Sequence, residues 1–102
     1  MKVKLNVLER LTIGGLMPEA GSFANLKLVR EAKESLSFTE KEFKEYELTS
    51  LPNGSIQWAN DSEKSIELGD VVVGLLREAL KKLDEEEALE ARHVSIYEKL
   101  IV

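Results

Sequence analysis

The stretch GDVVVGLLREALKKLDEE, residues 69–86, carries the strongest hydrophobic pattern in the chain. Its apolar residues recur every three to four positions, which is the period of one face of an α-helix. Three consecutive valines are poor helix formers, but the regular spacing outweighs their propensity. We therefore predict a long helix over about 69–86 that forms part of the core. The apolar positions of this stripe are Val71, Val72, Val73, Leu75, Leu76, Ala79, Leu80 and Leu83.

This stripe is wider than the core of a 102-residue chain is expected to cover. A surplus apolar face on so small a protein predicts a partner, and a second copy is the simplest one. We expect a homo-oligomer, a dimer or larger, with the long helix as its interface. Trp58 either packs in the core or serves as an exposed aromatic anchor at an interface. The expected interface residues are Val72, Leu76, Ala79, Leu83 and Trp58.

Two helix starts are marked upstream of this stripe. Thr39 and Glu42 have the spacing of a capping box, and Phe38 and Phe43 flank it as a hydrophobic staple. They predict a short helix over about 40–46. Ser22 is a suitable N-cap for an earlier helix that ends near residue 35, whose apolar positions recur at helical spacing.

The N-terminal segment has two interpretations. Leu5, Leu8 and Leu11 share one helical face, which predicts a first helix over about 3–13. Val3, Leu5 and Val7 also alternate as in a strand, so the beginning of this helix stays open. We expect the helix to weaken at Gly14-Gly15, and Pro18 bars its continuation.

A hairpin and a last helix complete the predicted elements. Alternating residues on both sides of Asn53-Gly54, a strong hairpin turn, predict a β-hairpin over about 46–59. We expect Ile56 and Trp58 to face the core, and a polar loop over 60–65. After a break between residues 86 and 90, a final helix follows.

The predicted class is α+β: a mainly helical single domain, residues 1–102, with one β-hairpin. The order of helix, helix, short helix, hairpin, long helix and short helix resembles a winged helix, αααββα(α). That layout suggests DNA binding, but the charges oppose it. The third helix has three acids against two lysines, and the hairpin has no Lys or Arg between residues 45 and 62. DNA binding needs several basic contacts to phosphates, so we do not expect direct nucleic-acid binding.

A second resemblance covers most of the chain. The segments VLERL at 7–11, LMPEAGSF at 16–23 and LSFTE at 36–40 resemble the opening of small uncharacterised proteins of tailed phages and prophages, and so does the tail with LKKLD at 80–84 and YEK at 97–99. The shared motifs are turns, caps and helical stripes. The resemblance implies a protein of a virus or mobile element acting in the cytoplasm of a bacterial host, and such proteins often inhibit or adapt host components.

The inventory of reactive side chains is small. The chain has no cysteine and one histidine, His93, which we interpret as a solvent-facing or half-buried structural residue. We expect no enzyme activity, no catalytic residues, no metal and no cofactor. No segment approaches the roughly 20 apolar residues that span a bilayer, and no signal peptide is recognisable, so we expect no membrane association.

Charge supplies two further candidates. The net charge is −5, and the densest acid run is Asp84, Glu85, Glu86 and Glu87. It is either a cation site or a docking patch for a basic partner surface, or it is a solvated helix end. Acids are unfavourable at a helix C-terminus, which suggests that they begin a new helix instead. A small anion, such as a nucleotide-like signal, could instead bind at the Ser22 helix start with help from basic residues. The candidates for that site are Ser22, Lys27, Arg30, Arg77 and Arg92.

The functional prediction is therefore a non-enzymatic, homo-oligomeric phage-type interaction protein that inhibits a host defence or nucleic-acid-processing protein. A sponge-like binder of a small nucleotide signal is the first alternative. A winged-helix transcription regulator is the second.

Overall fold

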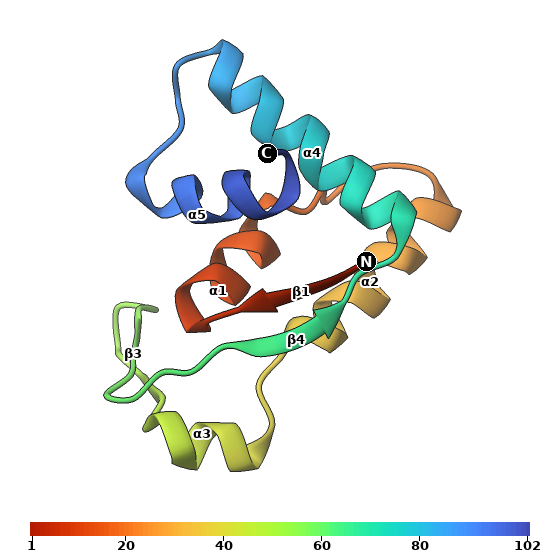
Figure 1. The fold of residues 1–102 in the computed structure, drawn as a ribbon. Coiled ribbons are helices and arrows are strands. Elements are labelled where there is room, and N and C mark those ends of the chain that lie inside the picture. Colours follow the sequence, from red (N-terminus) through yellow and green to blue (C-terminus); the bar gives the residue numbers. More distant parts are fainter.

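The computed structural model describes residues 1–102. Five helices and four short strands form a mainly helical α+β domain, which confirms the predicted class at this level (Figure 1). In chain order the elements are β1 (Lys2–Leu5), α1 (Val7–Leu16), α2 (Phe23–Leu36), α3 (Glu40–Tyr46), β2 (Thr49–Ser50), β3 (Ile56–Gln57), β4 (Lys64–Glu67), α4 (Asp70–Glu85) and α5 (Ala91–Leu100).

The chain begins with a strand, so the helix predicted from residue 3 is wrong at its start. Strand β1 pairs antiparallel with β4, and Val3 lies opposite Ile66. Both of these side chains are buried, as is Leu5, because the alternating apolar residues of β1 face the core. The expected polar loop over 60–65 therefore ends in a strand that begins at Lys64.

Helix α1 starts later than predicted and continues past both glycines. Asn6 is its N-cap: the Asn6 side chain accepts a hydrogen bond from the Glu9 N–H, and the Glu9 carboxylate accepts one from the Asn6 N–H. The helix runs through Gly14 and Gly15 to Leu16, because packing of its buried face outweighs the low helix propensity of glycine.

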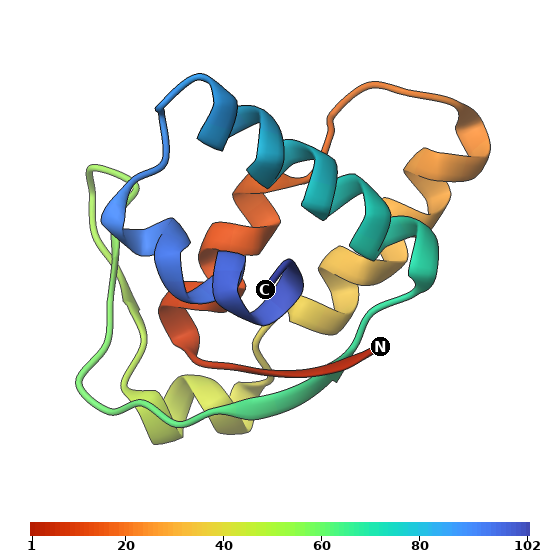
Figure 2. The same cartoon turned by 45° about the horizontal axis from the view of Figure 1, so that its top comes forward.

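The core lies between α1, α2, α4, α5 and one face of the β1–β4 pair (Figures 1 and 2). The apolar stripe of the long helix is central to it, as the sequence predicts. Together the core residues form one cluster: Val3, Leu5, Ile13, Met17, Val29, Ala32, Leu36, Ile66, Leu68, Val72, Val73, Leu76, Leu80, Ile96 and Leu100.

The predicted helix starts upstream are confirmed. Ser22 caps α2, and Thr39 forms the capping box of α3 with Glu42. The rings of Phe38 and Phe43 meet edge to face, with centroids 6.3 Å apart. Helix α2 ends at Leu36, one residue beyond the predicted end.

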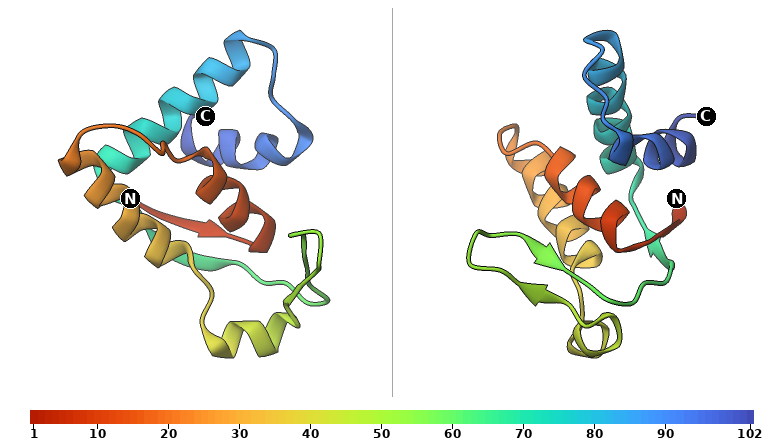
Figure 3. Two further views of the ribbon diagram at one scale, coloured as in Figure 1. Left: turned by 180° about the vertical axis from the view of Figure 1, so that it is seen from behind. Right: turned by 90° about the vertical axis from the view of Figure 1, so that its left-hand side faces the viewer.

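The hairpin is present but lies outside the core. Strands β2 and β3 pair antiparallel with Thr49 opposite Gln57, and both project from the body of the molecule beside α3 (Figure 3). Ile56 is exposed and Trp58 is half-buried, so the prediction that both face the core is wrong. No residue of β2 or β3 belongs to the core cluster. Tyr46, the last residue of α3, is buried but also lies outside that cluster.

None of the five helices combines the length and the apolar character that crossing a membrane requires.

Candidate functional site

The expected interface residues separate into two groups. Val72 and Leu76 are buried within the chain itself, so they belong to the core and offer no surface. Ala79 and Leu83 are half-buried, and they line a surface groove between the end of α1 and the C-terminal half of α4. The groove has a volume of about 350 Å³, and its other lining residues are Gly15, Leu16, Lys82 and Glu86.

The fifth expected interface residue, Trp58, directly follows β3 and belongs to neither group. It lines a shallow hollow of about 600 Å³ on the hairpin. Ile56, Gln57 and Ala59 line the same hollow from β3 and the residues after it, and Glu47 and Thr49 line it from β2 and the residues before it. The hairpin thus offers a separate apolar surface with one aromatic residue.

The acid run ends α4 and does not begin a new helix. Asp84 and Glu85 are the last residues of α4, and α5 starts only at Ala91. Glu87 has a positive φ of 54°, and the next N–H, that of Ala88, donates to the Leu83 carbonyl at 2.8 Å. This turn closes the helix and leaves the acidic side chains exposed. Asp84 also accepts a hydrogen bond from the Tyr97 hydroxyl at 3.3 Å.

Part of the predicted anion site comes together on α2. Lys27 and Arg30 line a hollow of about 430 Å³ with Phe23 and Leu26. Phe23 is 84% exposed, the highest value for an aromatic residue in the chain. Ser22 lies next to it, where its hydroxyl caps the helix by accepting a hydrogen bond from the Asn25 N–H.

The other two predicted arginines lie elsewhere. The Arg77 Nε donates to the Leu100 carbonyl at 2.6 Å, and this contact ties α4 to the end of α5. Arg92 pairs with Glu90 at 2.9 Å beside the start of α5. Neither lines the hollow on α2, so the structure does not join them to Lys27 and Arg30.

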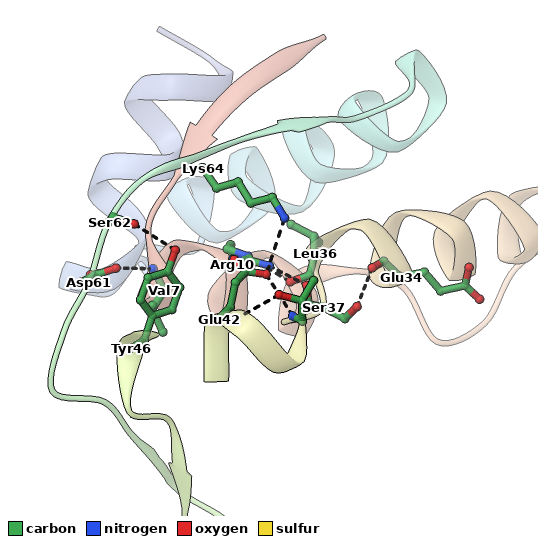
Figure 4. A network of polar contacts seen from close by, with 11 residues as sticks. Val7, Arg10, Glu34, Leu36, Ser37, Glu42, Tyr46, Asp61, Ser62 and Lys64 are labelled. Carbon is green, nitrogen blue, oxygen red and sulfur yellow. Dashed lines mark hydrogen bonds and ion pairs between the residues drawn. The ribbon is translucent and has the colours of Figure 1, made fainter. Parts of the chain in front are cut away.

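A buried ion pair that sequence analysis missed joins α1 to α3 (Figure 4). Arg10 donates to both carboxylate oxygens of Glu42, at 2.5 and 3.3 Å. Its remaining donors reach the carbonyls of Leu36 at 3.1 Å and Ser37 at 2.6 Å, the last residue and the C-cap of α2. Lys64 adds a second cation, 3.5 Å from Glu42, so the pair links four segments of the chain.

The Glu42 carboxylate is held in its charged form. Burial by itself raises the pKa of Glu42, but the hydrogen bonds from Arg10 and from the Thr39 N–H outweigh it. The charges of Arg10 and Lys64 act in the same direction, and together these contacts lower the pKa from 4.5 to about 2.

The Arg10 guanidinium also lies 4.0 Å from the centre of the Phe38 ring. Phe38 and Phe43 line a groove of about 470 Å³ together with Arg10, and Phe43 is 48% exposed. Leu11, Gly14, Lys33 and Leu36 are among its other lining residues. Arg10 also lines this apolar groove between α1, α2 and α3, and its ion pair with Glu42 holds that part of the lining in place.

A second buried carboxylate, Glu9, precedes Arg10 in α1 and contacts Lys99 of α5. Lys99 donates to Glu9 and to Glu63 at 2.8 Å each, and to the Lys4 carbonyl at 2.7 Å. The second oxygen of Glu9, Oε2, is buried and has no hydrogen-bond partner. Asn6-x-x-Glu9 is a capping-box spacing, so the sequence did contain a signal for Glu9 but none for Lys99.

His93 is buried, where a solvent-facing or half-buried position was expected. Its Nδ1 accepts a hydrogen bond from the Glu90 N–H at 2.9 Å, which satisfies a free donor at the start of α5. This contact gives His93 the structural role that the sequence predicts. No three His, Asp or Glu side chains gather in a way that could hold a metal ion.

No family model, curated protein sequence or solved structure matches this chain.

Proposed function

We propose that this chain is a non-enzymatic interaction protein of the phage type, which self-associates and inhibits a host protein in the bacterial cytoplasm. The proposal rests on one observation, the amount of surface that the single chain leaves exposed. The accessible surface is 6733 Å² for an 11.5 kDa chain. A monomer of this mass typically exposes about 5,800 Å², so the excess is about 900 Å².

That excess is close to what a binding partner covers. A standard protein–protein interface buries about 800 Å² on each side. The exposed residues also include large apolar side chains, among them Phe23 and Phe43, each about half exposed or more. Exposed aromatic residues beside shallow hollows are typical anchors of protein interfaces.

The acid run at the end of α4 supports a basic partner. Glu85, Glu86 and Glu87 are exposed, and the whole chain carries a net charge of −5. Such a surface attracts a basic host protein over distances of about a Debye length, and added salt weakens that attraction.

Two measurements test the proposal. Sedimentation equilibrium over a hundredfold concentration range should give a mass above 11.5 kDa. Affinity capture from bacterial lysate should retain a host protein that elutes with salt. A variant in which residues 84–87 are all lysine should lose that protein, while Trp58→Ala tests the hairpin independently. A monomer at every concentration that captures nothing would contradict the proposal.

A small anionic ligand is the second candidate, favoured by the hollow on α2. Phe23 offers a ring on which a base can stack, and Lys27 and Arg30 offer charges for phosphates. A thermal-shift screen with cyclic and ADP-ribose-type nucleotides tests this sponge-like function. Stabilisation of the parent chain that is lost in Arg30→Ala would support it, and no shift with any nucleotide would oppose it.

A winged-helix transcription regulator is the third candidate, and it has less support. In that layout α3 would enter the DNA groove, yet it exposes Glu40 and Glu45 beside Lys41 and Lys44. Like charges so close to phosphates weaken binding. Retention of duplex DNA at low salt would revive this candidate.

A further inference from the structure

We infer that the start of α2 docks on a second copy of this chain, in the groove that Leu16, Ala79 and Leu83 line. This inference rests on the proposed self-association and names its surface and contacts. Phe23 is the anchor, and Lys27 and Arg30 face the acidic end of α4 in the other copy. We call the two surfaces the α2 patch (Phe23, Leu26, Lys27, Arg30) and the α4 groove (Gly15, Leu16, Ala79, Lys82, Leu83, Glu86).

The α2 patch contains the aromatic side chain with the largest exposed fraction, which a partner can cover. Phe23 is the first residue of α2, and its side chain is 84% exposed because little of the chain packs against it. Covering an aromatic ring removes more apolar surface from water than covering any aliphatic side chain. Leu26 lies half-buried beside it and extends the apolar surface along the helix.

The α4 groove is a suitable acceptor for that ring. Its volume of about 350 Å³ lies between two helices, and Leu16, Ala79 and Leu83 supply an apolar floor. All three are half-buried, so the groove is already partly formed in the single chain. A groove that exists before binding loses less entropy when it is filled.

Charge complementarity favours a second copy of this chain as the partner that binds in the α4 groove. Lys27 and Arg30 are exposed cations on a chain that is acidic overall. The groove is lined by Lys82 as well as Glu86. Asp84, Glu85 and Glu87 are exposed beside Glu86, so acids outnumber the lysine at this end of the groove. The chain therefore holds both halves of one complementary pair, an aromatic–basic patch and an apolar groove with an acidic rim.

The arrangement of the two surfaces fits a two-fold dimer. In Figure 2 the start of α2 and the end of α4 lie at opposite ends of the upper edge of the molecule, on either side of the segment that connects α1 to α2. Two copies related by a two-fold rotation can each place α2 on the other's groove, which makes the contact twice. The exposed excess of about 900 Å² per chain is what such an interface would cover.

The first test measures dimerisation of the full chain by sedimentation equilibrium. Phe23→Ser should raise the dimer dissociation constant at least tenfold, because it removes the anchor. Val94→Ser is the matched control: Val94 is 52% exposed on α5, outside both surfaces, so its dimerisation should equal that of the parent. Circular dichroism checks that both variants fold.

The second test exchanges charges between the two surfaces. Lys27→Glu/Arg30→Glu and Glu86→Lys/Glu87→Lys should each dimerise at least tenfold more weakly, because each brings like charges together. Mixing the two variants should restore dimers, since every contact in the mixed dimer again joins opposite charges. Lys2→Glu/Lys41→Glu lowers the net charge by as much as Lys27→Glu/Arg30→Glu but outside both surfaces, and it should dimerise nearly as the parent does.

Each other outcome has a defined meaning. A parent chain that stays monomeric overturns this inference and leaves the host-binding part of the proposed function to its own capture experiment. A parent dimer that Phe23→Ser and both charge variants leave intact overturns the inference while self-association stands. A mixture that fails to restore dimers overturns the pairing of these two surfaces.

Discussion

Glu9 and Glu42 occupy equivalent positions in two capping boxes, yet the tertiary structure treats them differently. Each follows its N-cap by three residues, Asn6 in α1 and Thr39 in α3, and each is buried. Each also meets a cation from a distant part of the chain, Lys99 and Arg10 respectively. The same local motif thus becomes the attachment point for two long-range contacts.

The difference lies in how completely each carboxylate is satisfied. Glu42 accepts two hydrogen bonds from Arg10 and one from the Thr39 N–H, and Lys64 is a second cation beside it. Its pKa is lowered to about 2. Glu9 leaves Oε2 without a partner. Burial raises the pKa of Glu9, while Lys99 and the Asn6 N–H lower it to a net value below 4.5.

The two sites differ in the type of cation that contacts the buried carboxylate. The planar guanidinium of Arg10 reaches two carboxylate oxygens and two carbonyls at once. The ammonium of Lys99 reaches one oxygen of Glu9 and divides its other donors between Glu63 and Lys4. We therefore expect the Arg10–Glu42 contact to contribute more to stability than the Lys99–Glu9 contact.

The largest expected effect comes from Arg10→Met. It leaves the Glu42 charge buried with only Lys64 beside it, and uncovers the carbonyls of Leu36 and Ser37. Urea unfolding should show a loss of about 4 kcal/mol in the free energy of unfolding. Lys41→Met, which removes an 84% exposed lysine, is the control and should cost less than about 0.5 kcal/mol. A loss under about 1 kcal/mol for Arg10→Met would contradict the comparison.

The second largest effect should come from acid, which weakens the contact between Glu42 and Arg10. The pKa of Glu42 is lower in the folded chain, so the unfolded chain takes up the proton first as the pH falls. This contribution is complete above pH 4.5 and is lost between pH 4.5 and about 2. It amounts to about 3 kcal/mol. Urea midpoints of the parent and of Glu42→Gln should converge over this range, and a constant gap would show that Glu42 does not titrate there.

Lys99→Met tests the weaker partner of the comparison. It leaves Glu9 buried without a cation, but Lys99 is 30% exposed, so water replaces part of the lost contact. We expect a loss of about 2 kcal/mol in the free energy of unfolding. Glu63→Gln, at the exposed end of the same cluster, should cost about 0.5 kcal/mol. A larger loss for Lys99→Met than for Arg10→Met would reverse the ranking.

The smallest effect should come from the caps themselves. Asn6→Ala and Thr39→Ala each remove one side-chain acceptor and should each cost about 1 kcal/mol. Ser22→Ala removes an exposed cap that has no capping box and should cost less than either. If Asn6→Ala and Thr39→Ala lose equal free energy of unfolding, the difference between the two sites comes from their cations. Unequal losses would mean that it comes from the caps.

Local features of the sequence predicted a good part of the fold. The box at Thr39, the staple of Phe38 and Phe43, the cap at Ser22 and the stripe of α4 each depend on residues within one or two turns. Neighbours along the chain carry the whole signal in such cases. The position of the hairpin was likewise predictable from its turn, but the direction of Ile56 and Trp58 was not, because no adjacent element covers them.

The candidate surfaces were only partly predictable. Lys27 and Arg30 share a helix face with Phe23, and helical spacing predicts that arrangement. The groove of Ala79 and Leu83 needs Gly15 and Leu16 from α1, whose place beside α4 depends on packing of the whole core.

The sequence by itself determined where the helices α2, α3 and α4 begin, because caps and apolar spacing act over a few residues. Only the tertiary structure decided that residues 2–5 form a strand, since each residue of β1 pairs with a residue of β4 that is 59 to 65 positions away. It also decided which charges are buried. Arg10 and Lys99 look like ordinary surface residues until folding brings a carboxylate to each, and a buried charge is tolerated only when such a partner arrives.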